Sequence, residues 1–195
     1  MLGATVSATT DPVQAQVRGI MISATLEYVE TRWGEDVRGA VLEACRPAIA
    51  GAIRSVVDGG WYPVAWQNGL DAAVVEATGN PDALYELGHD TAGPTIRAEL
   101  GRQPHMVPLE RLFERSPQLM RAYFEGAGCE ELERERGRAL RRYEGPGFAQ
   151  TLWDRFRGSL VGMLEAVGCH EVDAVIREGG GESGFMLVEL RWRGR

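Results

Sequence analysis

The feature that most constrains this chain is its last third, where helical spacing of apolar residues gives way to strict alternation. Apolar residues recur at steps of three and four from Phe148 to Val167, which places them on one face of a helix. Apolar and polar residues then alternate over 172–176 and again over 186–192, with a glycine-rich, turn-like run between. This pattern predicts one long helix followed by a β-hairpin with one covered face.

Glycines punctuate the predicted helix. Gly145 and Gly147 precede it, and Gly168 stands where a C-terminal glycine would end it. Gly158 and Gly162 lie within it, four residues apart, and each costs about 1 kcal/mol relative to alanine in a helix interior. We therefore expect another backbone to approach closely at these two glycines, with a dimer seam as the alternative.

The first two thirds of the chain show helical spacing broken by glycine and proline. We expect a first helix over about 19–33, a second from Glu35 to before Pro47, a third from Ile49 to Val57 and a fourth from Pro63 through Val75. A fifth runs from Asn80 to Leu100 with a bend at Pro94, and two short helices cover Leu109–Phe113 and Leu119–Phe124. The fold class is then α+β, with the strands near the C-terminus.

The segment from Glu130 to Glu144 is ambiguous. It holds five glutamates and five arginines, both good helix formers, so propensity alone narrowly favours a helix. Gly137 interrupts it near the middle, and a hairpin that turns there is the alternative.

Length and composition fit one globular domain. The 195 residues are 44% hydrophobic and 25% charged, which is typical of chains that bury a core rather than of disordered chains. We expect residues 1–16 to form a flexible leader and residues 17–195 to form a single domain.

Charge and residue usage argue against several kinds of function. The net charge of -7 is unlike that of a general nucleic-acid binder, which shows a concentrated basic surface. All 21 basic residues are arginine, so no lysine is present for a Schiff base or a phosphate loop. Three widely spaced cysteines, no signal peptide and no long apolar run predict a cytoplasmic protein with reduced thiols and no membrane span.

Four phrases in fixed order carry a resemblance to known domains. They are RGIMISATLEYVETRWGED, WYPVAWQNGLDAA, GNPDALYELGHDTA and GSLVGMLEAVGCHEVDAVIREGGGESGFMLVELRW. Their order over residues 17–192 resembles a myxobacterial paralogous family of domains of unknown function. The part from Gly158 to Trp192 also resembles the 4-vinyl reductase ligand-binding domain. The whole layout is similar to the haem nitric-oxide-binding (H-NOX) domain.

The resemblance implies an H-NOX-like fold, with helices followed by a four-stranded antiparallel sheet in the order β-β-α-β-β. Residues 130–136 and 138–143 would then be strands, and the helix from Phe148 would pack across the sheet. Related folds hold small apolar or haem ligands between helices and sheet. By fold analogy alone, this favours a ligand-binding, signalling module.

Haem and metal sites find little support in the residues. A haem nitric-oxide sensor needs a proximal histidine on a helix and a Tyr-x-Ser-x-Arg motif, and no tyrosine here is followed by serine two residues later. His89, in a helical pattern, is the best axial candidate, ahead of His105 in a loop. A lone helical histidine is more often a surface or core residue. Cys169 and His170 are adjacent but too few for structural zinc, so we expect no metal and no cofactor.

Catalytic motifs are also missing, since no G-x-S-x-G and no strand-borne G-x-G-x-x-G occur. The aromatic cluster Trp61, Tyr62 and Trp66 has two interpretations, as core packing or as one wall of a ligand pocket. In the second, Phe148, Trp153 and Phe156 form the opposite wall. The predicted pocket residues are Trp61, Tyr62, Trp66, His89, Phe148, Trp153 and Phe156.

The sequence therefore favours a non-enzymatic, cytoplasmic sensory or ligand-binding regulatory module for a small apolar ligand. The first alternative is a protein–protein interaction adaptor whose pocket has filled with side chains. The second is a haem-based gas sensor with His89 as axial ligand. A protein partner or a homodimer is compatible with each of them.

Overall fold

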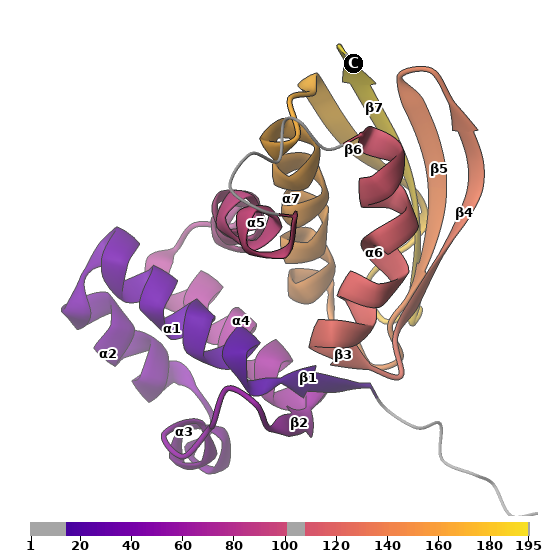
Figure 1. The fold of residues 1–195 in the computed structure, drawn as a ribbon. Coiled ribbons are helices and arrows are strands. Elements are labelled where there is room, and N and C mark those ends of the chain that lie inside the picture. Colours follow the sequence, from indigo (N-terminus) through magenta and orange to yellow (C-terminus); the bar gives the residue numbers. More distant parts are fainter. Residues whose placement is uncertain (1–14, 101–107, 195) are drawn as a thin grey trace, which may run out of the picture.

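The computed structural model describes residues 15–100 and 108–194 (Figure 1). The helices are α1 Gly19–Trp33, α2 Glu35–Ala44, α3 Pro47–Ile53, α4 Val64–Thr78, α5 Ala83–Leu100, α6 Leu109–Tyr123 and α7 Gln150–Ala166. The strands are β1 Gln16–Arg18, β2 Trp61–Pro63, β3 Phe124–Glu125, β4 Gly128–Glu135, β5 Arg138–Glu144, β6 His170–Gly179 and β7 Phe185–Arg193.

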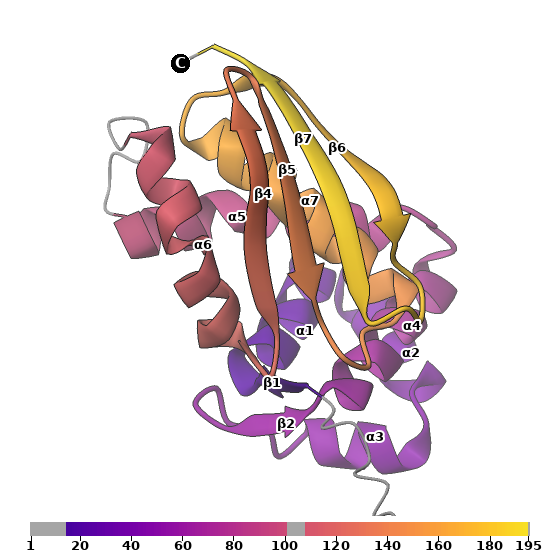
Figure 2. The same ribbon diagram turned by 90° about the vertical axis from the view of Figure 1, so that its right-hand side faces the viewer.

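Strands β4 to β7 form one antiparallel sheet in the order β4-β5-β7-β6. The helices lie on one side of this sheet and leave its other face open (Figures 1 and 2). On β7 the side chains of Met186, Val188, Leu190 and Trp192 are buried toward the helices. The α+β class, the order β-β-α-β-β and the covering helix α7 are therefore confirmed.

The ambiguous acidic and basic segment forms the hairpin β4–β5. The helix that propensity narrowly favoured is wrong, and the strands implied by the resemblance are correct. Glu135 pairs with Arg138 around a turn in which Gly137 has a φ of 78°, a conformation that glycine adopts without steric cost. The alternation of this hairpin is hard to see in the sequence because one of its buried positions is occupied by a charged residue, Arg141.

A second, three-stranded sheet in the order β2-β1-β3 was not predicted. It joins the start of the domain to Trp61–Pro63 and to the end of α6. Pro63 therefore ends a strand instead of opening a helix, and α4 begins at Val64. Residues 1–14 of the expected leader lie outside the described residues, whereas Ala15 is buried and Gln16 pairs with Pro63.

Two further helix boundaries differ from expectation. Helix α6 is one continuous helix that includes Pro117, not two short ones. Helix α5 begins at Ala83, after a turn in which the Asn80 side chain accepts a hydrogen bond from the backbone N–H of Asp82 at 2.9 Å. It includes Pro94, as expected.

Helices α5 and α7 cross at backbone contact, and glycines make this possible. A Cβ atom on Gly158 would collide with the Tyr85 carbonyl oxygen, and one on Gly88 would collide with the Arg155 carbonyl oxygen. Gly162 meets the His89 carbonyl oxygen in the same way. The close approach expected at Gly158 and Gly162 is confirmed, and it lies within the domain.

Candidate functional site

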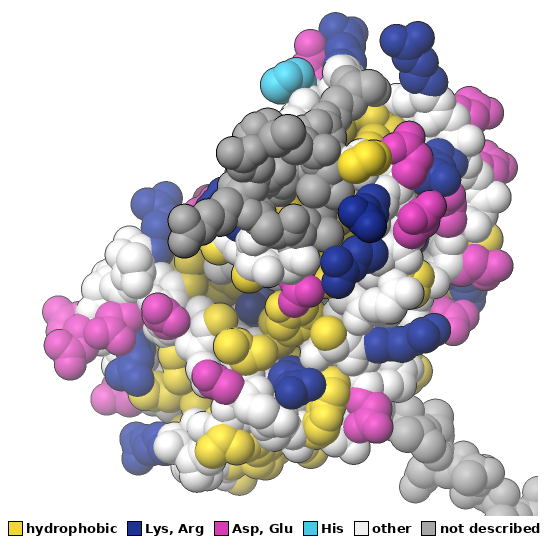
Figure 3. Space-filling view, viewed as in Figure 1, with side chains coloured by type: hydrophobic (Ala, Val, Ile, Leu, Met, Phe, Trp, Pro, Cys, Tyr) yellow, Lys and Arg dark blue, Asp and Glu magenta, His cyan; other side chains and the backbone are white. Residues whose placement is uncertain are grey.

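A cavity of about 580 Å³ lies between helices α1, α5, α6 and α7. Apolar side chains gather in the hollow between α1 and α6 (Figure 3). The apolar part of the wall comprises Ile20, Met21, Ala24, Ala92, Pro94, Ala98, Leu119, Met120, Phe124, Leu152, Phe156, Leu160 and Met163. The site is thus a mostly apolar chamber built from helices that are far apart in the sequence.

Most hydroxyl groups of the wall already donate their hydrogen in a hydrogen bond within the protein. Thr91 donates to the Leu87 carbonyl oxygen at 2.7 Å, Thr95 to that of Thr91 at 2.9 Å, and Ser159 to that of Arg155 at 3.1 Å. These bonds follow the helix backbone, so the three hydroxyls offer a ligand only their lone pairs. The buried hydroxyl of Tyr143 differs, since it has no hydrogen-bond partner among the described residues.

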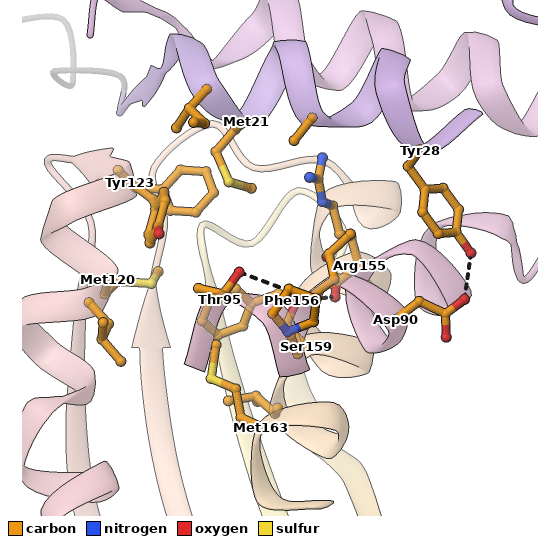
Figure 4. A pocket seen from close by; sticks show the side chains of 18 of the residues that line it. Met21, Tyr28, Asp90, Thr95, Met120, Tyr123, Arg155, Phe156, Ser159 and Met163 are labelled. Carbon is orange, nitrogen blue, oxygen red and sulfur yellow. Dashed lines mark hydrogen bonds between the residues drawn. The ribbon is translucent and has the colours of Figure 1, made fainter. Parts of the chain in front are cut away.

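One buried ion pair includes a residue of the wall, Arg155. Arg155 reaches from α7 toward α1 (Figure 4), and its Nη1 donates to Thr25 Oγ1 at 2.7 Å. The same Nη1 lies 3.6 Å from Oδ1 of Asp71, which is fully buried on α4. Gln67 donates to this Oδ1 at 2.7 Å. The network connects α1, α4 and α7, and Arg155 joins it to the cavity wall.

Burial controls the charges of this pair. Loss of hydration raises the pKa of Asp71 to about 6, against the lowering effects of Arg155 and of the Gln67 hydrogen bond. Burial also lowers the pKa of Arg155 from its ordinary value, while Asp71 opposes that shift. The carboxyl group of Asp71 therefore keeps its proton to a higher pH than an ordinary aspartate does.

A chain of four polar side chains crosses the rim of the cavity. The Tyr28 hydroxyl of α1 donates to Oδ2 of Asp90 at 2.8 Å, and Oδ1 of Asp90 lies 3.0 Å from Nδ1 of His89. His89 Nε2 lies 2.7 Å from Oε2 of Glu165 on α7. The Asp90 hydrogen bond, assisted by Glu165, raises the pKa of His89 against the effect of burial. We call these residues, Tyr28, Asp90, His89 and Glu165, the rim chain.

Of the predicted pocket residues, only Phe156 lines the cavity. Tyr62 of β2 stacks on Trp66 of α4 at 5.3 Å between ring centroids, and neither these two residues nor Trp61 of β2 lines the cavity. Phe148 and Trp153 pack on each other at 4.8 Å in the core and are almost fully buried. His89 belongs to the rim chain, with both ring nitrogens engaged. His105 lies outside the described residues.

Sequence reasoning missed Arg155 as a site residue, although a signal was present. Leu152, Phe156, Leu160 and Met163 follow one helical stripe, and Arg155 stands in that stripe, three residues after Leu152. A charged residue on an apolar helix face is unusual, because burial of a charge is costly. The residues that α1, α5 and α6 supply to the cavity wall show no comparable pattern in the sequence.

Comparisons with known proteins identify the fold. The Fe(II) unliganded H-NOX protein from K. algicida superposes with a TM-score of 0.70 at 12% identity, over 91% of this chain and 97% of that one. The fold is H-NOX-like. An oxygen-binding H-NOX domain related to soluble guanylate cyclases gives a TM-score of 0.64 at 14% identity, over 91% and 95% of the two chains. A variant of the T. Tengcongensis H-NOX protein gives 0.65 at 15%, over 91% and 98%.

The sequence itself matches no protein-family model and no curated protein. The likenesses to a myxobacterial family and to 4-vinyl reductases therefore remain predictions. In the described ranges, no cluster of three or more histidine, cysteine, aspartate or glutamate side chains is placed to hold a metal ion. Nor is any helix of those ranges long and apolar enough to cross a bilayer.

Proposed function

We propose that this protein is a non-enzymatic ligand-binding module whose small, mostly apolar ligand occupies the cavity between α1, α5, α6 and α7. The observation that carries the proposal is the cavity itself, about 580 Å³ with an apolar wall and few polar groups. Small-molecule sites have about this size and this character. The H-NOX-like fold supports a sensory or regulatory role by analogy only.

The cavity also weighs against the adaptor alternative. An adaptor with a collapsed pocket requires an interior filled by side chains, whereas the space beside Met21, Met120 and Met163 is open. Methionine side chains are flexible and polarisable, so they adapt to ligands of different shapes. The proposal is compatible with a homodimer or with a protein partner that responds to the ligand. It is also compatible with a cytoplasmic location.

Ligand-dependent stability tests the proposal. Purified full-length protein is analysed by native mass spectrometry for a co-purified small molecule, and a library of apolar compounds is screened by thermal shift. A ligand at about 100 times its dissociation constant stabilises the folded state by about 2.7 kcal/mol, and the melting temperature rises accordingly. A bound molecule or specific thermal shifts are expected.

A cavity-filling variant assigns the binding to this chamber. Ala24→Phe places a ring in the wall formed by α1, so it should abolish the thermal shifts. Ala40→Phe, on the exposed face of α2, is the matched control and should leave them unchanged. Equal shifts in both variants would place the ligand elsewhere and remove the basis of the proposal.

A haem-based gas sensor is the second candidate, favoured by the fold alone. The described wall residues do not fit histidine-ligated haem, because none is histidine or cysteine, and His89 engages both ring nitrogens outside the cavity. The wall tyrosines Tyr28, Tyr123 and Tyr143 have raised pKa values, mainly through burial, which disfavours a phenolate ligand. Arg155 is the one cation of the described wall that could pair with a haem propionate, and it is already paired with Asp71.

Reconstitution with haem separates the two candidates. We expect haem added to the purified protein to give no sharp Soret band beyond that of free haem. A stoichiometric Soret band that is lost in His89→Ala would establish the haem sensor and His89 as its ligand.

A further inference from the structure

Arg155 has hydrogen-bonding capacity that the described chain does not use. Its side chain is only 4% exposed and lies in the cavity wall. Nη1 donates to Thr25 and faces Asp71, while the N–H groups on Nε and Nη2 donate to none of the residues that the structure describes. Neither nitrogen is among the fully buried polar atoms that lack a partner, so both keep some accessible surface. If a ligand covered these N–H groups without accepting from them, the cost would be about 1–3 kcal/mol, and more because the group is charged. Because Arg155 lines the cavity, these two groups are the donors that it has left for a ligand there.

The surrounding charges decide what kind of acceptor suits Arg155. Asp71, at 3.6 Å, already balances its positive charge. The other charged side chains of the described wall, Glu27 and Asp90, are both acidic and exposed at the rim. A ligand carboxylate would pass these acids and then add a second negative charge beside Asp71 in a poorly hydrated space. A neutral oxygen acceptor would satisfy the N–H groups without adding charge.

The remaining wall fits the apolar body of such a ligand. Thioethers and aromatic rings line the cavity near Arg155, among them Met21 of α1 and Phe156 and Met163 of α7 (Figure 4). The nearby hydroxyls of Thr95 and Ser159 have given their hydrogens to helix carbonyls. Arg155 is thus the principal donor available to orient a ligand from α7.

We propose, on the basis of the proposed function, that the cavity selects a neutral apolar molecule bearing a carbonyl oxygen, and that this oxygen accepts hydrogen bonds from Arg155. Arg155 is then the specificity-determining residue of the site. Hydrocarbons of the same shape bind without this interaction, and carboxylates are disfavoured by Asp71, Glu27 and Asp90.

Three probes of the same size and similar shape test this assignment: cumene, acetophenone and benzoate. Each combines a phenyl ring with a three-atom branched group that is apolar, carbonyl-bearing or anionic. Dissociation constants are measured by NMR titration of the full chain. The measured quantity is the ratio of the cumene to the acetophenone dissociation constant, which cancels the shared contribution of the ring. We also expect benzoate to bind more weakly than acetophenone.

Substitutions test whether Arg155 causes the preference for acetophenone over cumene that this ratio measures. Arg155→Met should lower it by about tenfold, the size of one hydrogen bond to a charged donor. The double variant Asp71→Asn/Arg155→Met removes both members of the buried pair and gives the same readout without leaving Asp71 uncompensated. Arg157→Met is the matched control, because Arg157 lies outside the cavity with its guanidinium 5.1 Å from the Tyr85 ring centroid. The ratio should not change in this control.

An infrared measurement reports the contact directly. The carbonyl band of bound acetophenone should lie at lower wavenumber in the wild type than in the double variant, because hydrogen bonding weakens the C=O bond. An equal ratio in wild type and double variant, an unshifted band, or tighter binding of benzoate than of acetophenone would each overturn the role of Arg155 while leaving the cavity as a ligand site. Failure of all three probes to bind would instead contradict the proposed function itself.

Discussion

At the scale of single residues, Gly158 shows how one missing side chain sets the distance between two helices. A Cβ atom at this position would overlap the Tyr85 carbonyl oxygen, a backbone atom that cannot rotate away. Any larger residue must therefore push α5 away from α7. Since both helices line the cavity, the glycine contact also positions the site.

Gly158→Ala is expected to lower the free energy of unfolding by about 1–3 kcal/mol, as overpacking does in well-packed interiors. The measurement is chemical denaturation followed by circular dichroism. Gly39→Ala is the control, because nothing lies within 4 Å of a Cβ atom built on this glycine of α2. The control should be neutral or stabilising, by up to about 1 kcal/mol. A neutral Gly158→Ala would show that the two helices can separate without loss.

Asp71 should make stability depend on pH in an unusual direction for a carboxylate. Burial raises its pKa to about 6 in the folded protein, above its ordinary value of 3.8. The folded state therefore binds this proton more tightly than the unfolded state does. The stabilisation is complete below the unfolded pKa and is lost as the pH rises through the folded pKa.

Asp71→Asn removes this titration. The free energy of unfolding of the wild type, relative to that of the variant, should fall between about pH 4 and pH 6 and then stay constant. Urea denaturation at several pH values gives both numbers. A difference that does not vary with pH would mean that Arg155 holds Asp71 ionised throughout this range.

At the scale of elements, the rim chain connects three helices that are distant in sequence. Tyr28 belongs to α1, Asp90 and His89 to α5, and Glu165 to α7. When His89 is protonated, it donates to a carboxylate on each side, and this raises its pKa. Its contribution to stability is present below the ordinary histidine pKa and is lost as the pH rises through the raised value.

His89→Gln should therefore lower the melting temperature more at pH 6 than at pH 9, because only the charged imidazole interacts fully with Asp90 and Glu165. Thermal denaturation followed by circular dichroism gives the comparison. His170→Gln, at the exposed start of β6, is the control for the loss of a histidine. The same decrease for His89→Gln at both pH values would show that the rim chain works without protonation.

The elements also show where sequence reasoning succeeds. The alternation in β7 and the helical stripe in α7 each reflect one face buried along the whole element, so the residues alone predicted both. In β4–β5 the inward positions include Arg141, which is buried against the Phe113 ring at 5.1 Å. A buried arginine looks like a solvent-facing one in a sequence, and the alternation was lost. Strands β1 to β3 have only two or three residues each, too few to show any period.

At the scale of the whole molecule, the four-stranded sheet and its covering helix were predictable, and the site was not. The architecture follows from periodic patterns and from a resemblance in the order of four phrases. The cavity depends on how α1, α5, α6 and α7 meet, and no local pattern records that. The aromatic residues chosen from the sequence, Phe148 and Trp153, complete the core beside the chamber. Bulky aromatic residues fill space, so they are poor markers of the places where space remains.

The chamber has a consequence for the life of the protein in a cell. Helices usually pack against one another without a large void, but these four surround a volume that their side chains leave open. The apolar atoms on that surface lack part of the packing that stabilises an ordinary interior. A guest molecule would supply these contacts and reduce the fraction of chains open to proteolysis. The amount of protein that persists would then follow the supply of its ligand, even at a constant rate of synthesis.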